Sequence, residues 1–131
     1  MYILKCSKRC VKFKNVTVIN DRIENYSSKE REKFDIVTCR AVTSIPMILE
    51  MATPIVKVNG ILAPLKSNCE EELVKYSYLE QELGIKLIQK EVYSLPINDA
   101  YRVIPVYKKE KVTDKKYPRS YNSLLKIYKN K

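Results

Sequence analysis

The sequence contains no histidine and only two glycines, Gly60 and Gly84, among its 131 residues. The absence of histidine excludes catalytic triads and Cys-His pairs, because both depend on an imidazole. At ordinary usage a chain of this length would hold about nine glycines. Glycine-rich loops let the backbone approach a phosphate or nucleoside closely, and the sequence has no such loop. A self-contained nucleotide-binding domain is therefore not expected.

Cysteine pairs and long hydrophobic runs are also missing. Four cysteines, Cys6, Cys10, Cys39 and Cys69, form no CxxC pair. Their spacing favours reduced thiols over a zinc site. No apolar run reaches the roughly 18 residues that a membrane-spanning helix needs, and no signal peptide is recognisable at the start. We therefore expect a cytoplasmic protein with no membrane partner and no metal.

Positive charge is plentiful and lies at the two ends of the chain. The net charge is +10; residues 1–14 contribute +5, residues 15–107 contribute −2, and residues 108–131 contribute +7. Such a distribution is typical of a folded body with basic ends that bind a polyanion, here nucleic acid. A solvated tail that keeps the protein soluble is the alternative. We expect a single domain over residues 1–131, with a basic tail at 108–131.

Short β-branched and apolar runs predict five strands. The expected strands are Val16–Ile19, Phe34–Cys39, Ile61–Leu65, Ile85–Tyr93 and Tyr101–Tyr107. Between them, residues 24–33 could form a short helix or a loop, and helical spacing of apolar residues covers 44–58 and 67–83. A short helix is possible near Leu124–Tyr128. The order of elements indicates an α/β fold, with a mostly parallel sheet extended by two antiparallel strands.

Proline, glycine and capping residues suggest where these elements begin and end. Pro46 suits the first turn of a helix, whereas Pro54 would end or kink it. Asn59 and Gly60 indicate a turn. Ser67 is a candidate cap for the next helix, and Gly84 is the residue type expected at its end.

Polar residues follow the first three expected strands. Asp21–Glu24, Arg40 and Lys66 each stand just beyond a carboxyl end, where ligands bind in sheets of this type. Arg40 is favoured as a functional residue over a surface ion pair. Lys66 is expected to be an ordinary solvated lysine.

Several stretches together carry a family resemblance. Asn15–Glu24, Phe34–Val42 with its Arg-Ala-Val ending, Pro54–Lys66, Tyr101–Lys109 and Lys115–Ser120 match in order and spacing. They resemble the C-terminal part of the bacterial 16S rRNA guanine-N7 methyltransferases, also called the glucose-inhibited division protein B family. The resemblance covers most of residues 15–120.

The resemblance implies an incomplete class I, Rossmann-like fold that uses S-adenosylmethionine to methylate N7 of a guanine in 16S rRNA. It places Ile23 and Glu24 against the adenosine of the cofactor and Arg40 near the donor and the base. Lys115, Lys116, Tyr117 and Arg119 would contact RNA. For Glu24, a carboxylate at a helix start is an equally good interpretation.

Two departures from the family pattern weaken the expected activity. The glycine-rich donor loop is absent, and Leu4 and Lys5 stand where a carboxylate should meet the ribose. We therefore expect poor binding of the donor and weak or no activity. Guanine N7 carries a lone pair and no proton, so its methylation needs alignment and not histidine. There are two alternatives to an enzyme. The chain could be a non-catalytic RNA-binding remnant, or a module that pairs its sheet edge with another chain.

Overall fold

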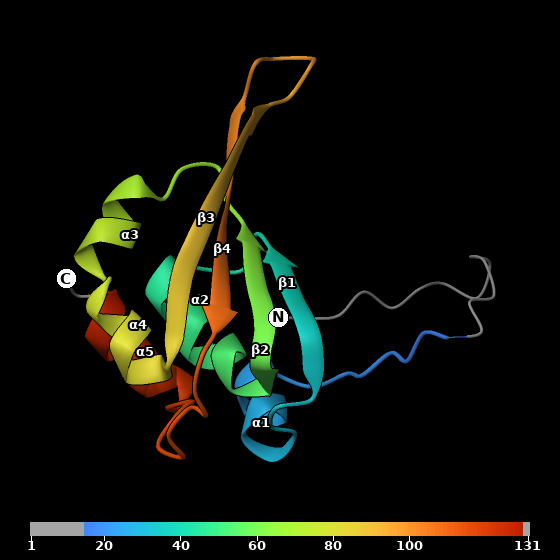
Figure 1. Ribbon diagram of the computed structural model, residues 1–131, viewed down its shortest axis with the longest axis vertical. Helices are drawn as coiled ribbons and strands as arrows, with labels where there is room; N and C mark the ends of the chain where they lie inside the picture. The colour runs from blue at the N-terminus through green and yellow to red at the C-terminus, as the bar shows by residue number, and fades with distance from the viewer. Residues whose placement is uncertain (1–14, 130–131) are drawn as a thin grey trace.

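A computed structural model describes residues 15–129 and shows one four-stranded sheet (Figure 1). The basic segment 1–14, including Leu4 and Lys5, lies outside the described residues. The strand order is β1-β2-β4-β3, from β1 (Phe34–Arg40), β2 (Val56–Leu65), β3 (Ile85–Ser94) and β4 (Tyr101–Lys109). The α/β fold class is confirmed. The prediction of a mostly parallel sheet is wrong for the described residues, because only β1 and β2 pair in parallel.

The strand expected at Val16–Ile19 is not formed. Val16 and Val18 are 58% and 55% exposed, and no strand lies between residue 15 and β1. β-branched residues favour a strand only where a ladder and a packed face receive them. Within residues 15–129, no second strand lies beside this segment to provide either.

The connection from β1 to β2 is a buried helix. α2 (Ile45–Ala52) is buried at every position, with Pro46 in its first turn as expected. The helix is shorter than predicted, because Pro54 cannot continue it and residues Thr53–Ile55 form the 3₁₀ helix η1. α1 (Ile23–Lys29) occupies the segment that could have been a loop.

Asn59 and Gly60 lie inside β2 and not in a turn. β2 begins at Val56, and its register against β1 jumps between the pairs Phe34–Val56 and Ile36–Ile61. Asn59 takes a positive φ of 69° in this irregularity. A Cβ on Gly60 would lie 2.8 Å from the carbonyl oxygens of Asp35 and Lys57, so glycine lets the two strands approach.

The segment predicted as one helix at 67–83 forms two, α3 (Glu70–Lys75) and α4 (Tyr78–Leu83). Cys69, and not Ser67, is the N-cap of α3. Gly84 ends α4 with a φ of 72°, as its residue type predicted. The antiparallel β3–β4 hairpin is confirmed, and Figure 1 shows it extending well beyond the rest of the sheet.

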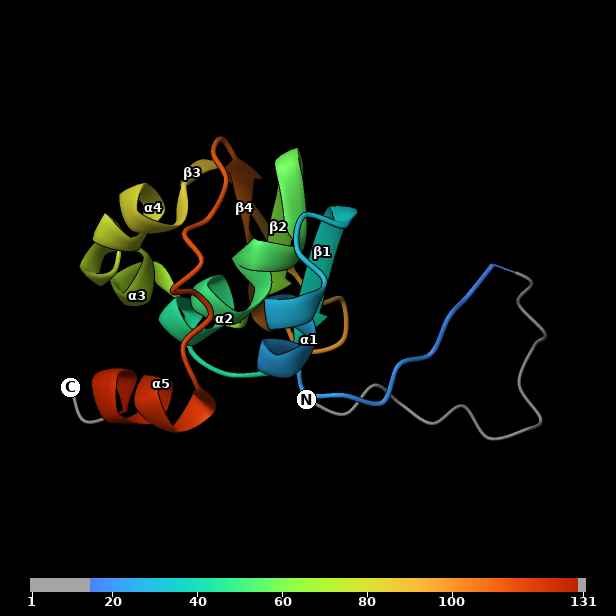
Figure 2. The same cartoon turned by 90° about the horizontal axis from the view of Figure 1, so that it is seen from below.

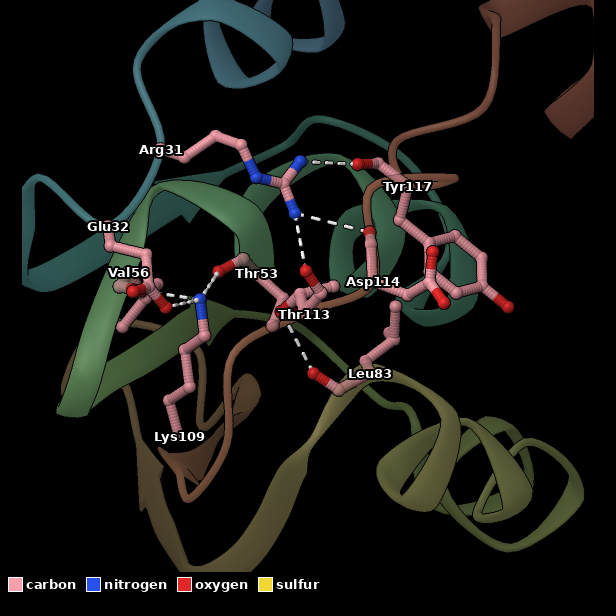
Figure 3. A network of polar contacts seen from close by, with 9 residues as sticks. All are labelled: Arg31, Glu32, Thr53, Val56, Leu83, Lys109, Thr113, Asp114 and Tyr117. Atoms are coloured by element: carbon pink, nitrogen blue, oxygen red, sulfur yellow. Dashed lines mark hydrogen bonds and ion pairs between the residues drawn. The ribbon is translucent and has the colours of Figure 1, made fainter.

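The C-terminal segment expected to be an irregular basic tail is part of the fold. Thr113, Tyr117 and Leu124 are at most 3% exposed, and α5 (Tyr121–Tyr128) packs on the core with Ser120 as its N-cap. The guanidinium of Arg31 holds this segment through three carbonyl oxygens (Figure 3). They belong to Thr113 at 2.6 Å, Tyr117 at 2.6 Å and Asp114 at 3.2 Å.

Lys109, at the end of β4, is a buried cation with 1% of its surface exposed. Its Nζ donates to the carbonyls of Thr53 at 3.1 Å and Val56 at 2.7 Å (Figure 3). Glu32 Oε1 lies 3.0 Å from Nζ as an ion pair without hydrogen-bond alignment. Burial lowers the pKa of Lys109, and the Glu32 contact opposes that shift. The lysine therefore ties β4 to η1 and to the loop before β1.

A buried carboxylate on α2 anchors α5. Glu50 is fully buried and accepts from Arg119 Nε at 3.0 Å and from the hydroxyl of Tyr128. The Glu50 contact raises the pKa of Arg119, and burial raises that of Tyr128. Removing Arg119 would leave the Glu50 carboxylate poorly compensated in the core.

The helices lie on one side of the sheet, and the face turned to the viewer in Figure 1 carries no helix among residues 15–129 (Figure 2). Side chains alternate accordingly along β4: Val103, Pro105 and Tyr107 are buried, and Ile104 and Val106 are only half-buried. Within residues 15–129, no helix is long and apolar enough to cross a membrane.

Candidate functional site

Two cavities open where the parallel strands β1 and β2 end. The first has a volume of about 420 Å³ and the second about 520 Å³. Val42 and Thr43, in the loop after β1, line both cavities and form the wall between them. Ala41 in the same loop has a positive φ of 54°, a strained conformation for a residue with a Cβ. Both cavities thus lie at the carboxyl ends of these strands, where the sequence predicted that ligands bind.

The loop between β1 and α2 is held by two charged side chains. Lys66 Nζ donates to the carbonyl of Thr43 at 2.9 Å, and the Glu72 carboxylate accepts from the amide of Ile45. Lys66 Nζ and Glu72 lie 4.0 Å apart. Lys66 was expected to be solvated, but its side chain is only 17% exposed. That expectation is wrong, because the lysine bridges the end of β2 to the loop.

The first cavity combines apolar and acidic groups. Ile23 and Glu24 both line it at the start of α1, and their contact with the adenosine of a donor stays a prediction. Glu24 is 9% exposed, and its Oε1 lies 2.7 Å from Arg22 Nε. Arg22 also stacks over the Tyr121 ring at 4.7 Å, so α5 closes one side. Its other lining residues are Asn20, Asp21, Met51 and the shared Val42 and Thr43.

The second cavity is cationic. Arg40, Lys66 and Arg102 line it together with the aromatic Tyr93, and no carboxylate is among its lining residues. Tyr93 and Arg102 are directly paired across the β3–β4 hairpin, so both side chains are on the same face of it. The structure therefore puts Arg40 in a different cavity from Ile23 and Glu24, across the Val42–Thr43 wall.

Arg102 and Tyr93 were missed by the sequence analysis. Both lie within strands that were predicted, but no sequence signal links the hairpin to the end of β1. Their pairing could have been found from the hairpin register, since residues directly opposed on two antiparallel strands share a face.

The four residues expected to contact RNA do not behave alike. Lys115 and Lys116 are exposed, so their contact with RNA stays a prediction. Tyr117 is 3% exposed and its hydroxyl donates to Glu82 at 2.6 Å, while Arg119 is bonded to Glu50. Burial of the Tyr117 ring leaves no face for a base to stack on. These two residues serve the fold.

The thiol next to Arg40 is held in its neutral form. Burial raises the pKa of Cys39 to about 11, and nearby Lys66 only partly offsets this. Burial also raises the pKa of Cys69. Both are free thiols, and residues 15–129 hold no cluster of three or more potential metal ligands. The raised pKa makes each thiol less nucleophilic at neutral pH than an ordinary cysteine.

Comparison with known proteins shows the family. The family model described as GidB, rRNA small subunit methyltransferase G, matches residues 2–112. The ribosomal RNA small subunit methyltransferase G of Acholeplasma laidlawii is 37% identical over 110 residues, which are 83% of this chain and 47% of that protein. The same enzyme from Fusobacterium nucleatum is 35% identical over 123 residues, or 94% of this chain and 53% of that protein.

The chain spans about half the length of the curated relatives it matches. Among solved structures, the M1.HpyAVI–SAM complex is similar with 16% identity over 68% of this chain and 52% of that chain, at a TM-score of 0.39. This likeness is too slight to build on, and the sequence matches alone carry the assignment. Because the family match covers most of its length, the chain belongs to the rRNA small subunit methyltransferase G (GidB) family.

Proposed function

We propose that this chain forms part of the site of an enzyme that transfers a methyl group from S-adenosylmethionine to N7 of a guanine in 16S rRNA. The observation that carries the proposal is the pair of cavities with a common wall at Val42 and Thr43. One is suited to a nucleoside with hydroxyl groups, the other to an anionic nucleotide. A methyl donor and an acceptor base must lie side by side for transfer, and two adjoining cavities meet that need.

The first cavity fits one side of the donor only. Ile23 offers an apolar surface, and the Glu24 carboxylate can accept hydrogen bonds from a ribose or an adenine. No glycine lines the cavity: Gly60 lies in β2 and Gly84 at the end of α4. Residues 15–129 thus supply no close glycine cradle at this cavity for the amino-acid end of the donor. Ile23 and Glu24 would hold the adenosine side, and the bound donor supplies an electrophilic methyl group.

The second cavity suits the acceptor nucleotide. Arg40 and Arg102 carry fixed positive charges that match RNA phosphates, and a guanidinium can also donate to guanine O6. Tyr93 offers a ring on which an unstacked base can lie. Because N7 must keep its lone pair free, the arginines would orient the base through O6 or its phosphate and leave N7 open.

The reaction requires alignment and no general base, since guanine N7 carries no proton. Thr43 and Val42 separate the two cavities and would set how donor and base approach each other. Lys66 fixes that wall through the Thr43 carbonyl. The proposal includes 7-methylguanosine in 16S rRNA as the product, the small ribosomal subunit as the partner, and the cytoplasm as the location.

The test of this proposal is RNA binding by Arg40→Ala. Fluorescence anisotropy with a labelled fragment of 16S rRNA, at fixed salt, should show affinity at least about fivefold weaker, since a phosphate or base contact is lost. Lys57→Ala is the matched control: Lys57 is exposed, pairs with Asp35 and lies near the opposite end of β2. Equal affinities for wild type and Arg40→Ala would reject the second cavity as the RNA site.

A second function, RNA binding without catalysis, is favoured by the missing glycine cradle. The two functions differ in one observable. If the chain forms part of a methyltransferase site, it must contribute to the binding of S-adenosylhomocysteine once the remaining residues of that site are supplied. If the chain is an RNA-binding remnant, it makes no such contribution.

A further inference from the structure

The β3–β4 hairpin projects from the edge of the sheet at which the two cavities open. Because β2 and β3 both pair antiparallel with β4, β3 runs parallel to β2, and the turn of the hairpin follows the carboxyl end of β3. The last pairing of the hairpin with the β2 side is the bridge between Lys66 and Val103. Beyond this bridge, no other strand among residues 15–129 pairs with the hairpin, and Figure 1 shows its end standing clear of the other elements.

The tip of the hairpin, residues 95–100, has a defined shape and an apolar end. The amide of Leu95 donates to the carbonyl of Ala100 at 3.1 Å and closes the loop. Asn98 Oδ1 accepts from the amide of Ala100 at 3.2 Å. Between these contacts Ile97 is 97% exposed, the highest value among the large apolar side chains of residues 15–129. An isoleucine held in water at the end of a projecting, hydrogen-bonded loop is placed to contact a partner.

The tip is continuous with the cationic second cavity. Tyr93, Leu95 and Arg102, all from the hairpin or its tip, line that cavity. Ile97 is two residues beyond Leu95, which is at most about 7 Å of chain. Successive phosphates of a nucleic-acid strand rise by about 3.4 Å, so Ile97 lies within about two nucleotide steps of the cavity wall. A nucleotide held in the second cavity would therefore have its neighbours in the RNA strand beside Ile97.

The chemistry of the acceptor explains why an apolar side chain is useful there. The major groove of an RNA helix, which N7 faces, is too deep and narrow for side chains, so a guanine has to leave its stack to enter a cavity. Its departure leaves a gap between the neighbouring bases. Proteins open such base steps with apolar side chains, isoleucine and proline among them. Pro96 and Ile97 are residues of these two types at the end of the hairpin.

We propose that the tip is an RNA wedge: Ile97 enters the base stack beside the acceptor guanine and fills the gap that opens when the guanine moves into the second cavity. The inference rests on the proposed function, since it takes the second cavity as the place of the acceptor nucleotide. Residues 94–101 contain no basic side chain and one acidic side chain, Asp99. The tip therefore contributes apolar contact and releases no counterions, whereas Arg40 and Arg102 supply the charge.

The test measures the affinity of Ile97→Ser for two labelled RNAs by fluorescence anisotropy at fixed salt. One is a folded fragment of 16S rRNA, and the other is an oligouridine with one central guanine, which has little base stacking to open. Ile97→Ser should weaken binding of the folded fragment at least about fivefold, as expected for the loss of an aliphatic side chain that becomes partly buried. Its affinity for the oligouridine should change by less than about twofold, because no stack has to be opened there.

Two further variants separate a wedge from a general loss of structure. Ile97→Leu should keep the affinity of wild type, since leucine is also a wedge residue. Val112→Ser is the matched control, because Val112 is 66% exposed and follows β4 at the opposite end of the hairpin. Ile97→Ser and Val112→Ser should both melt within about 2 °C of wild type. For Ile97→Ser, the slope of log affinity against log salt should stay unchanged, because no phosphate contact is lost.

Three outcomes would overturn the wedge. Equal binding of the folded fragment by wild type and Ile97→Ser would leave the tip for a protein partner. Equal losses on both RNAs would show a contact that opens no stack, and no RNA binding by wild type would overturn the wedge and the proposed function together. Otherwise the two fail separately. A selective loss with Ile97→Ser but none with Arg40→Ala would reject the second cavity and keep the wedge, and the reverse pattern would keep the cavity and reject the wedge.

Discussion

The basic residues of this chain form two groups that differ in what they face. Arg31, Lys109 and Arg119 turn inward and donate to main-chain carbonyls or to the carboxylate of Glu50. Arg40 and Arg102 line an open cavity whose lining residues include no carboxylate; Arg102 Nη1 donates to the carbonyl of its neighbour Tyr101 at 2.8 Å, whereas the first group donates to other elements of the fold. The first group holds the C-terminal segment on the core, and the second offers charge to a ligand.

This difference teaches that the contacts of a basic side chain, and not the local density of positive charge, distinguish a structural cation from one that is open to a ligand. Residues 108–131 carry a net charge of +7, yet Lys109 and Arg119 are already bonded there. The near-neutral middle, by contrast, contains the cationic cavity. Substitutions in the two groups should therefore affect different measurements, stability in one and RNA affinity in the other.

The largest effect is expected for Arg119→Ala. It leaves the fully buried Glu50 carboxylate with only the Tyr128 hydroxyl, so the free energy of unfolding should fall by about 3 kcal/mol. Urea denaturation followed by circular dichroism measures this. Glu50→Gln combined with Arg119→Ala should recover part of the loss. A loss below about 1 kcal/mol would show that the pair does not anchor α5.

Lys109→Met should lower the free energy of unfolding by about 2 kcal/mol. It removes two hydrogen bonds and leaves the carbonyls of Thr53 and Val56 without that donor. Lys108→Met, one residue earlier on the opposite face of β4, is the matched control and should change stability by less than about 0.5 kcal/mol. Equal losses of unfolding free energy for the two substitutions in urea denaturation would show that the buried contacts of Lys109 do not stabilise the fold.

Arg102→Ala should weaken RNA binding about fivefold while the urea midpoint stays unchanged. Arg102→Lys should restore only part of the affinity, because an ammonium keeps the charge but loses the planar, two-pronged donor geometry. Anisotropy with the same 16S rRNA fragment is the measurement. Full recovery with lysine would reduce the role of Arg102 to charge alone.

Lys115→Ala combined with Lys116→Ala should weaken RNA binding only about twofold. Both lysines are exposed on the segment after β4, so any phosphate contacts there are screened by salt. The slope of log affinity against log salt should fall by no more than about 2. A loss of RNA affinity larger than that caused by Arg102→Ala would show that the C-terminal segment, and not the second cavity, is the main RNA contact.

The smallest effect concerns the Cys39 thiol. Its pKa is about 11 in the folded chain, against 9.0 for a free thiol. The unfolded chain therefore releases this proton first, so the contribution of Cys39 to stability falls as pH rises from 9 towards 11. Peptide-level mass spectrometry should show slow alkylation of Cys39 by iodoacetamide below pH 9 and a steep rise towards pH 11. Fast labelling at pH 8 would contradict the burial.

Much of the fold follows from local signals in the sequence. Pro46 and Gly84 mark real helix boundaries because fixed or positive φ angles act within one or two residues. The β3–β4 hairpin was predictable from two neighbouring apolar runs. The turn predicted at Asn59 and Gly60 is wrong, because the same residue types that form turns also allow a bulge inside a strand.

The errors share one physical cause, which is dependence on partners distant in the sequence. Val16–Ile19 has the composition of a strand but no neighbouring strand in the described chain. Tyr117 and Arg119 looked like tail residues, yet their partners Glu82 and Glu50 lie 35 and 69 residues away. Arg40 lies at the carboxyl end of β1, where the carboxyl-end rule placed it, whereas the rule placed Ile23 and Glu24 after a strand at Val16–Ile19 that is not formed.

The central claim is that this chain holds the RNA side of a methyltransferase site and only one side of the donor. Isothermal titration of the purified chain with S-adenosylhomocysteine tests it most directly. Ile23 and Glu24 offer an apolar contact and one or two hydrogen bonds, each worth about 1 kcal/mol, against an association cost of at least ~4 kcal/mol. The account predicts a dissociation constant weaker than ~100 μM. A constant of a few micromolar (~8 kcal/mol of binding free energy) would show that the chain alone completes the donor site and would contradict the account.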